Sequence, residues 1–213
     1  MAEHQFSSPA GKILVFAREP VVGHVKTRLA RSIGDQAAVQ FHQEIVTKTV
    51  DMAANSGLAE LELHVSGNME HPFFRFLADQ YSMRICLQEG NDLGEKMFYA
   101  LKKALDHASY CILIGTDCPV MTADYLKQAF HILEKGMDAV IGPAEDGGYV
   151  LIGASRIDIS WFNNIDWGSQ HVLAQSRQRL TANNARYEEL QQLWDVDHID
   201  DLHRWRLTSS TLN

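Results

Sequence analysis

The chain has 213 residues, of which 46% are hydrophobic and 22% charged, and its 27 acidic and 19 basic residues give a formal net charge of -8. This length and composition suit a globular protein with a sizeable core, and they exclude an intrinsically disordered or collagen-like chain. The acidic balance argues against a general nucleic-acid binder, which needs a basic surface to meet the phosphate backbone. Any anion that this protein binds must therefore be held by a local group of cations.

The sequence contains no run of 18 or more apolar residues, so it predicts no membrane span. Residues 1–12, MAEHQFSSPAGK, lack the charged-then-apolar order of a secretory signal, and we therefore expect a cytoplasmic protein. The three cysteines, Cys86, Cys111 and Cys118, form no C-x-x-C pair. This pattern favours reduced, buried thiols over a disulfide framework or a zinc site.

Hydrophobic periodicity and turn residues divide the first part of the chain into alternating strands and helices. The expected elements are a strand at 12–17, a helix at 37–54, a strand at 58–65, a short helix at 72–80, a strand at 83–88, a helix at 93–108 and a strand at 110–115. The strand at 110–115 is apolar throughout, which is typical of a central strand covered on both faces. In the strand at 58–65, Glu60, Glu62 and His64 alternate with apolar residues, which predicts one solvent-facing side.

Short polar signals mark where the helices should begin. Asp35 stands where an N-cap is expected, Asp92 and Glu95 form a D-x-x-E capping box, and Thr122 can cap the next helix. The second part of the chain is expected to contain a helix at 122–136, strands at 137–144 and 149–154, a helix near 169–180, a strand near 185–190 and a helix around 200–207. Trp161, Phe162 and Trp167 are expected to pack the core of this part.

Strands and helices that alternate with short links indicate a mostly parallel central sheet with helices on both faces. No internal repeat, low-complexity tract or long linker divides the chain. We therefore expect a single Rossmann-like α/β domain over residues 1–213. In such sheets, ligands bind beyond the carboxyl ends of the strands, so the residues that follow each strand are the first candidates for a site.

The loop after the first strand is rich in cations. Arg18, Lys26, Arg28 and Arg31 lie within 14 residues, close to Gly23 and to an expected helix start. Free backbone N–H groups at a helix start favour an anion, so a phosphate cradle is one interpretation. The other is a solvated basic loop that pairs with surface acids. The glycine spacing of a Walker A motif is missing, which excludes that motif.

Two acidic segments could supply metal ligands. Asp117 follows the apolar strand at 110–115, where a carboxylate is well placed to hold Mg²⁺ or Mn²⁺ beside a diphosphate, although an Asx turn would also explain it. Asp197 lies in the segment DVDHIDD, 80 residues further along the chain, and helix capping is its alternative role. Only the fold can bring these two carboxylates to one ion.

A third acidic position lies in the segment GPAEDGGYVLIG. Asp146 precedes two glycines, and this sequence predicts a tight hairpin turn with Asp146 and Gly147 at its corner. A carboxylate at such a turn can also orient an acceptor or act as a base. The sequence shows no G-x-S-x-G and no H-E-x-x-H pattern, so it indicates neither a nucleophile elbow nor a zinc-protease helix.

The ordered segments FAREPVVGHVKTRL, NDLGEKM, LIGTDCP, GPAEDGGYVLIG and DVDHIDDL resemble a known group. They are similar to the bacterial glycosyltransferase-like family of the nucleotide-diphospho-sugar transferase superfamily, whose members have the glycosyltransferase A fold. The resemblance covers nearly the whole chain. It implies that residues 12–135 form a nucleotide-binding half and residues 136–213 an acceptor-side half.

The resemblance also assigns roles to individual residues. It implies nucleotide-phosphate contacts for the first loop, a base-side position for residues in LQEGNDLG, and metal ligation for two aspartates. The residues concerned are Gly23, Lys26 and Arg28 for phosphate, Gln88 and Gly94 for the base, and Asp117 and Asp197 for the metal. Arg18, a cation of the same loop, is a further candidate for nucleotide binding. The loop has fewer glycines than is usual in nucleotidyltransferases, and Asp117 is followed by Cys118 rather than a second aspartate, so no intact D-x-D motif is present.

These observations lead to one principal hypothesis and two alternatives. The first is a transferase that uses Mg²⁺ or Mn²⁺, binds a nucleoside diphosphate sugar and passes the glycosyl group to a small acceptor, with Lys26 and Asp146 as catalytic residues. The second is a nucleotidyltransferase that joins a nucleoside triphosphate to a phosphorylated substrate and releases pyrophosphate. The third is a nucleotide-binding module without turnover. No nucleic-acid or membrane partner is expected.

Overall fold

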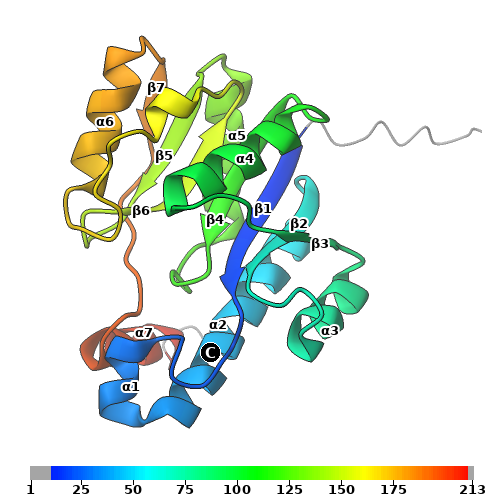
Figure 1. Ribbon diagram of the computed structural model, residues 1–213, viewed down its shortest axis with the longest axis vertical. Helices are drawn as coiled ribbons and strands as arrows, with labels where there is room; N and C mark the ends of the chain where they lie inside the picture. The colour runs from blue at the N-terminus through cyan, green and yellow to red at the C-terminus, as the bar shows by residue number, and fades with distance from the viewer. Residues whose placement is uncertain (1–10, 211–213) are drawn as a thin grey trace, which may run out of the picture.

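The computed structural model describes residues 11–210, so most of the N-terminal segment on which the signal-sequence expectation rests lies outside the described residues. A seven-stranded sheet forms the centre, with the strand order β3-β2-β1-β4-β6-β5-β7 (Figure 1). All neighbouring strands pair in parallel except β6, which is antiparallel to both β4 and β5. The strands are β1 Gly11–Arg18, β2 Glu60–Ser66, β3 Arg84–Leu87, β4 Tyr110–Gly115, β5 Ala139–Pro143, β6 Tyr149–Ala154 and β7 Tyr187–Glu189.

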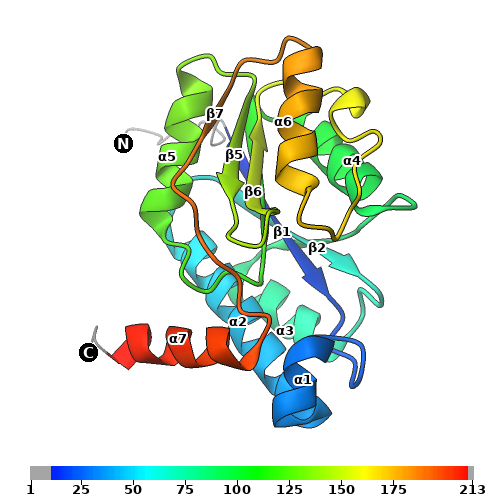
Figure 2. The same ribbon diagram turned by 90° about the vertical axis from the view of Figure 1, so that its left-hand side faces the viewer.

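Helices cover both faces of the sheet, as Figure 2 shows most clearly. The face that carries α2, α3 and α5 packs one apolar cluster, and the face that carries α4, α6 and the short 3-10 helix η1 packs a second. The helices are α1 Thr27–Ile33, α2 Asp35–Asn55, α3 Pro72–Tyr81, α4 Leu93–Leu105, α5 Ala123–Glu134, η1 Ile159–Trp161, α6 Val172–Ala182 and α7 Ile199–Ser210. In the described residues, none of them is both long enough and apolar enough to cross a bilayer.

A third apolar cluster lies beyond the carboxyl end of β1. There α1 and α7, from the two ends of the chain, contact each other and pack on the first turns of α2. Leu29, Phe41, Trp194, Leu202 and Trp205 are among its buried residues. This cluster fixes the C-terminal segment beside the loop that follows β1.

The predicted fold class is confirmed, and the expected strands and helices are present in the expected order, whereas α1 and η1 were not among the expected elements. The mostly parallel sheet, the central position of β4 and the helices on both faces all follow the sequence pattern. Thr122 caps α5 by accepting the Tyr125 N–H, and Asp92 caps α4 by accepting the Glu95 N–H. Phe162 is buried in the second cluster, and Trp167 packs against it.

Four local predictions about helix caps and burial were wrong. Gly34, not Asp35, precedes the first residue of α2, so Asp35 lies inside the helix and caps nothing. The carboxylate of Glu95 accepts the N–H of Asn91 instead of that of Asp92, so the capping box is only half formed. Cys86 is half-buried, whereas the two other cysteines are fully buried.

The fourth error concerns the polar side of β2. Glu62 and His64 were expected to face solvent, but they are only 6% and 4% exposed. These side chains are buried because β1 and β3 flank β2 and because α4 covers this face of the sheet. Lys12 of β1 donates to Glu62, and Phe16 of β1 stacks on His64. An alternating pattern therefore indicated a solvated face where the fold buries a polar cluster.

One buried carboxylate joins β5 to β7 at the edge of the sheet. Asp138 accepts hydrogen bonds from the side chains of Arg156 and Arg186 and from the backbone N–H of Arg186. The hydrogen bond from Arg156 is the largest cause that lowers the pKa of Asp138, to about 2. Because this pKa is lower in the folded than in the unfolded chain, the stabilisation exists above the unfolded pKa near 4 and is lost as the pH falls toward 2.

Asp138→Asn is therefore expected to lower the free energy of unfolding by about 1–2 kcal/mol at pH 7, because hydrogen bonds to a charged group are lost. Urea unfolding at a series of pH values measures this. The difference from the wild-type protein should shrink as the pH falls from 5 to 3. A difference that is constant over this range would contradict the assigned pKa.

Candidate active site

The loop after β1 ends at Lys26, whose backbone has φ 47° and ψ 41°, in the left-handed region that is unusual for a residue other than glycine. Lys26 immediately precedes α1, and its side chain is only 4% exposed. The ammonium contacts the carboxylates of Asp117 at 2.6 Å and Asp197 at 3.2 Å, and it donates to the carbonyl of Val196 at 2.7 Å. Its three N–H bonds thus meet three protein oxygens.

Two distant segments bring these oxygens together. Asp117 follows β4, in the centre of the sheet, and its carbonyl accepts the N–H of Val196 at 2.9 Å. The chain after β7 reaches this point by crossing the carboxyl end of the sheet, where Leu193 forms a bridge with Ala144. The structure therefore brings the first loop, Asp117 and Asp197 into contact.

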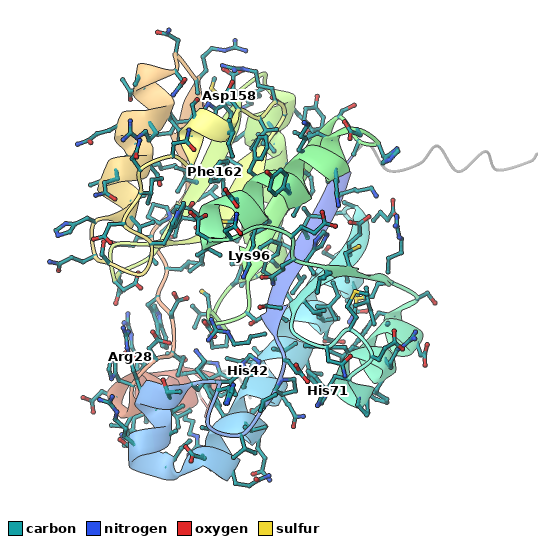
Figure 3. The ribbon with its side chains drawn as sticks, in the orientation of Figure 1. Arg28, His42, His71, Lys96, Asp158 and Phe162 are labelled. Carbon is teal, nitrogen blue, oxygen red and sulfur yellow. The ribbon has the colours of Figure 1, made fainter. Side chains whose placement is uncertain are left out.

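Arg28 adds a second cation on the outer side of the cluster. Its guanidinium lies 3.3 Å from Asp197, and its side chain is 60% exposed. In Figure 3, Arg28 extends from α1 toward the sheet, below the level of Lys96 on α4. The Asp197 carboxylate contacts Lys26 and Arg28, and the carboxylate of Asp201 accepts the N–H groups of Asp197 and His198 just before α7.

A further aspartate, Asp195, makes the cluster short of positive charge. Burial is the largest cause that raises the pKa of Asp195 to about 7, and the negative charges of Asp117, Asp146 and Asp197 raise it further. Lys26 opposes this shift but does not cancel it. Four carboxylates thus share one buried ammonium and one exposed guanidinium, which leaves the cluster able to accept a further cation.

Asp146 reaches the cluster from the turn between β5 and β6. The predicted hairpin turn is present, but Glu145 and Asp146 stand at its corner, because the N–H of Gly147 donates to the carbonyl of Ala144 at 3.3 Å. The Asp146 carboxylate accepts the N–H of Gly148 at 2.9 Å. Gly147 has φ 88°, and a Cβ atom there would lie 2.2 Å from the carbonyl oxygen of Gln170. The position therefore requires glycine, and the turn holds Asp146 with its carboxylate toward the pocket.

Two adjoining pockets, with volumes of about 570 and 680 Å³, meet at these acids. Asp117, Asp195, Arg18 and Tyr149 line both of them. The first pocket extends to β2, β3 and the start of α4. The second extends to β6, to the loop of residues 167–170 (the Trp167 loop) and to the start of α6. Each is large enough for a small-molecule ligand.

The two pockets collect most of the predicted site residues. Lys26 and Gln88 line the first pocket, and Arg28, Asp146 and Asp197 line the second. The Gln88 amide donates to the carbonyls of Ala17 and His64, so it ties β1, β2 and β3 together at their carboxyl ends.

Gly23 and Gly94 line neither pocket. Gly23 has φ 78° in the loop before Lys26, and Gly94 lies in the first turn of α4. A Cβ atom at Gly94 would lie 2.7 Å from the Trp167 ring. Gly94 therefore allows α4 to approach the Trp167 loop closely.

Sequence reasoning missed Lys96 and His42. Lys96 lines the first pocket from the first turns of α4, and it forms no ion pair with any residue that the structure describes. It belongs to the segment NDLGEKM, and its position just after the helix cap was the signal that could have indicated an anion contact. His42 is 4% exposed, its Nε2 lies 2.8 Å from the carbonyl of Arg18, and burial lowers its pKa.

The donor set of this cluster fits a hard divalent cation. Carboxylate oxygens are the ligands that Mg²⁺ and Mn²⁺ prefer, and burial, followed by the negative charges of the neighbouring carboxylates, raises the pKa of Asp195. A second, different group lies elsewhere: in the described part of the chain, Glu62, His64 and Cys86 are the group whose possible ligand atoms all lie within 4.8 Å of one another.

The family described as "Uncharacterized protein conserved in bacteria (DUF2064)" matches residues 49–169, which is more than half of the chain. The chain belongs to the DUF2064 family. The matched region contains Asp117, Asp146, Gln88 and Lys96, whereas Lys26 and Asp197 lie on either side of it. No curated protein matches the sequence significantly.

Similar solved structures show which fold this member of the DUF2064 family has. A "putative nucleotide-diphospho-sugar transferase" from Desulfovibrio desulfuricans is similar with a TM-score of 0.85 and 29% identity, over 93% of this chain and 87% of that one. A nucleotidyl transferase from Methanothermobacter has a TM-score of 0.65 and 13% identity, over 96% and 99%. A manganese complex of Rv0371c from Mycobacterium tuberculosis has a TM-score of 0.56 and 16% identity, over 91% and 96%. The predicted nucleotide-diphospho-sugar transferase fold is thereby confirmed.

The arrangement around Lys26 makes a prediction about stability. Lys26→Met should lower the free energy of unfolding by about 2 kcal/mol, because it leaves Asp117, Asp197 and the Val196 carbonyl without their shared donor. Urea unfolding near pH 7 measures this change.

Arg28→Met is the matched control. Its guanidinium is exposed and makes one long contact to Asp197, so its loss should cost less than about 0.5 kcal/mol. Equal costs for the two variants would mean that the buried ammonium does not organise the cluster.

Proposed function

We propose that the protein is a divalent-cation-dependent transferase that binds a nucleoside diphosphate sugar and passes its glycosyl group to a small acceptor. One observation carries the proposal: two ligand-sized pockets meet at Asp117 and Asp195, so a donor and an acceptor can lie on either side of one acidic cluster. The likeness to the Desulfovibrio protein supports the same reaction class.

The first pocket would take the nucleotide. It opens over the carboxyl ends of β1, β2 and β3, which is where open α/β sheets bind nucleotides. Its cations, Arg18 and Lys96, would contact the phosphates, and Lys96 does so from the start of a helix, where the backbone also favours an anion. Gln88 lies at the far side of this pocket, in reach of a base.

Lys26 would act mainly through the carboxylates. Its ammonium already meets Asp117, Asp197 and the Val196 carbonyl, so in this arrangement it holds the acids in place and limits their repulsion. Arg28, on the exposed side of Asp197, remains available to a phosphate group.

Asp117 and Asp197, with Asp195 beside them, would hold Mg²⁺ or Mn²⁺. When bound, such an ion neutralises the negative charge that develops on the departing diphosphate. Asp146 faces the second pocket from a rigid turn and would orient the acceptor hydroxyl or take its proton. Residues 12–135 would then supply most of the nucleotide contacts and residues 136–213 most of the acceptor contacts.

Asp117→Asn tests the cation dependence. Calorimetric titration with the common nucleoside diphosphates should show that Mn²⁺ strengthens binding to the wild-type protein, and that the variant loses at least about tenfold of this effect, since one charged ligand is removed. Asp79→Asn, on the exposed side of α3, is the control and should bind as the wild type does. Unchanged Mn²⁺ dependence in Asp117→Asn would contradict the assignment.

The reaction class is tested by the leaving group. The same site could serve nucleotidyl transfer, which the likeness to the Methanothermobacter enzyme favours. Glycosyl transfer from a nucleotide sugar releases a nucleoside diphosphate, whereas nucleotidyl transfer from a triphosphate to a sugar phosphate releases pyrophosphate.

A panel of nucleotide sugars with small alcohol and sugar acceptors should therefore yield nucleoside diphosphate when Mn²⁺ is present. A parallel panel of triphosphates with sugar phosphates should yield no pyrophosphate. The opposite result would replace the proposed reaction with nucleotidyl transfer.

A further inference from the structure

The buried polar cluster on β2 and β3 has no role in the proposed reaction. Glu62 and His64 are two residues apart on β2, and Cys86 lies directly beside His64 in the register of β2 with β3. All three side chains therefore lie on one face of the sheet, the face that α4 covers. Their possible ligand atoms lie within 4.8 Å of one another.

The hydrogen bonds within the protein leave this cluster incomplete. His64 Nε2 lies 3.1 Å from Glu62 Oε2, and His64 Nδ1 is buried with no hydrogen-bond partner. If Nε2 carries the proton, the lone pair of Nδ1 is unpaired. If Nδ1 carries it, that donor is unpaired and the Nε2 lone pair faces a carboxylate oxygen. In this second tautomer, a cation between Nε2 and Oε2 would replace the repulsive contact with two attractive ones, while Nδ1–H keeps no partner among the described residues.

We propose that Glu62, His64 and Cys86 bind a transition-metal ion of the zinc class, at a site separate from the acidic cluster around Asp117. A carboxylate, an imidazole and a thiolate are the three ligand types that zinc takes in proteins. Bonds of about 2.1 Å to O and N and about 2.3 Å to S, at tetrahedral angles, require separations of about 3.4 Å from O to N and about 3.6 Å from O to S. The observed separations from Glu62 Oε2 are 3.1 Å to His64 Nε2 and 4.0 Å to Cys86 Sγ.

The surroundings orient the ligands and balance the charge. Lys12 holds the other oxygen of Glu62 at 2.6 Å, which leaves Oε2 toward His64 and Cys86. Binding exchanges the S–H bond of Cys86 for a metal–sulfur bond and releases the proton to water, so a divalent ion adds one net positive charge. Lys12, Arg84 (3.7 Å from Glu62) and Lys103 (paired with Glu89) bring three positive charges to this pocket. The carboxylates around it are those of Glu60, Glu62, Glu89 and Asp106, so their four negative charges leave one to meet the added positive charge.

The fourth coordination position would open to a pocket. A cavity of about 460 Å³ between β2, β3 and α4 is lined by all three proposed ligands, and it shares no lining residue with the nucleotide pocket. An ion with an accessible fourth position can bind water or a small ligand, as catalytic zinc does. The three ligands lie on two strands, so the search for C-x-x-C and H-E-x-x-H patterns could not find them.

Co²⁺ is the probe that tests this site. Metal-free wild-type protein titrated with Co²⁺ should develop the near-ultraviolet absorption of a cobalt–thiolate bond together with visible bands of a tetrahedral ion, and Zn²⁺ should remove both. Cys86→Ser should lose the thiolate absorption and bind Zn²⁺ at least about tenfold more weakly, whereas Cys111→Ala, which removes a buried thiol outside the cluster, should behave as the wild type does.

Two further measurements separate this proposal from the proposed function and from misfolding. Asp117→Asn should keep the full Co²⁺ spectrum, because it alters only the other site. Thermal unfolding should show that Zn²⁺ raises the Tm of the wild type but not of Cys86→Ser, and the unliganded variant must unfold cooperatively. Absence of the thiolate band in the folded wild type, or Zn²⁺ affinity that Cys86→Ser leaves unchanged, would overturn the proposal.

Discussion

The contact of one buried ammonium with two carboxylates organises the functional end of this molecule. Lys26 comes from the loop after β1, Asp117 from the end of β4, and Asp197 from the segment that precedes α7. The two carboxylates repel each other, and the ammonium that contacts both offsets this repulsion. The two adjoining pockets exist where they do because these three segments meet.

The topology explains why the meeting point lies at this edge. Six of the seven strands run in one direction, so their carboxyl ends share one edge, and the antiparallel strand β6 begins there after the hairpin that carries Asp146. The cluster of α1, α2 and α7 closes the same edge from below and holds the C-terminal segment against Asp117. The strand directions and the charged side chains therefore indicate the same site, at the carboxyl ends of the strands.

Much of this could be predicted from the sequence. Apolar strands, turn glycines and the caps Asp92 and Thr122 indicated the expected strands and helices correctly, because each depends on residues that are neighbours in the chain. The rule that ligands bind beyond strand ends selected Arg18, Asp117 and Asp146, and all three line the pockets. Their chemical roles, and those of Gly23, Gly94, Gln88 and the metal, stay predictions.

What the sequence could not provide depends on contacts across the sheet. Lys26 was interpreted as a phosphate ligand because it lies in a basic loop, and nothing local showed that its partners would be Asp117 and Asp197. In the same way, the alternation in β2 suggested a solvated face, although Lys12 and Phe16 from the neighbouring strand bury Glu62 and His64. Periodicity reports the spacing of polar residues, and only the packed structure shows what covers them.

The central claim is that the carboxylates gathered by Lys26 form one cation-bridged diphosphate site. Crystals grown with Mn²⁺ and a nucleoside diphosphate, with data collected at the manganese absorption edge, test it most directly. We expect one anomalous peak in contact with carboxylate oxygens of both Asp117 and Asp197 and with the diphosphate. A manganese ion that contacts neither aspartate, or a diphosphate bound away from the ion, would contradict this account.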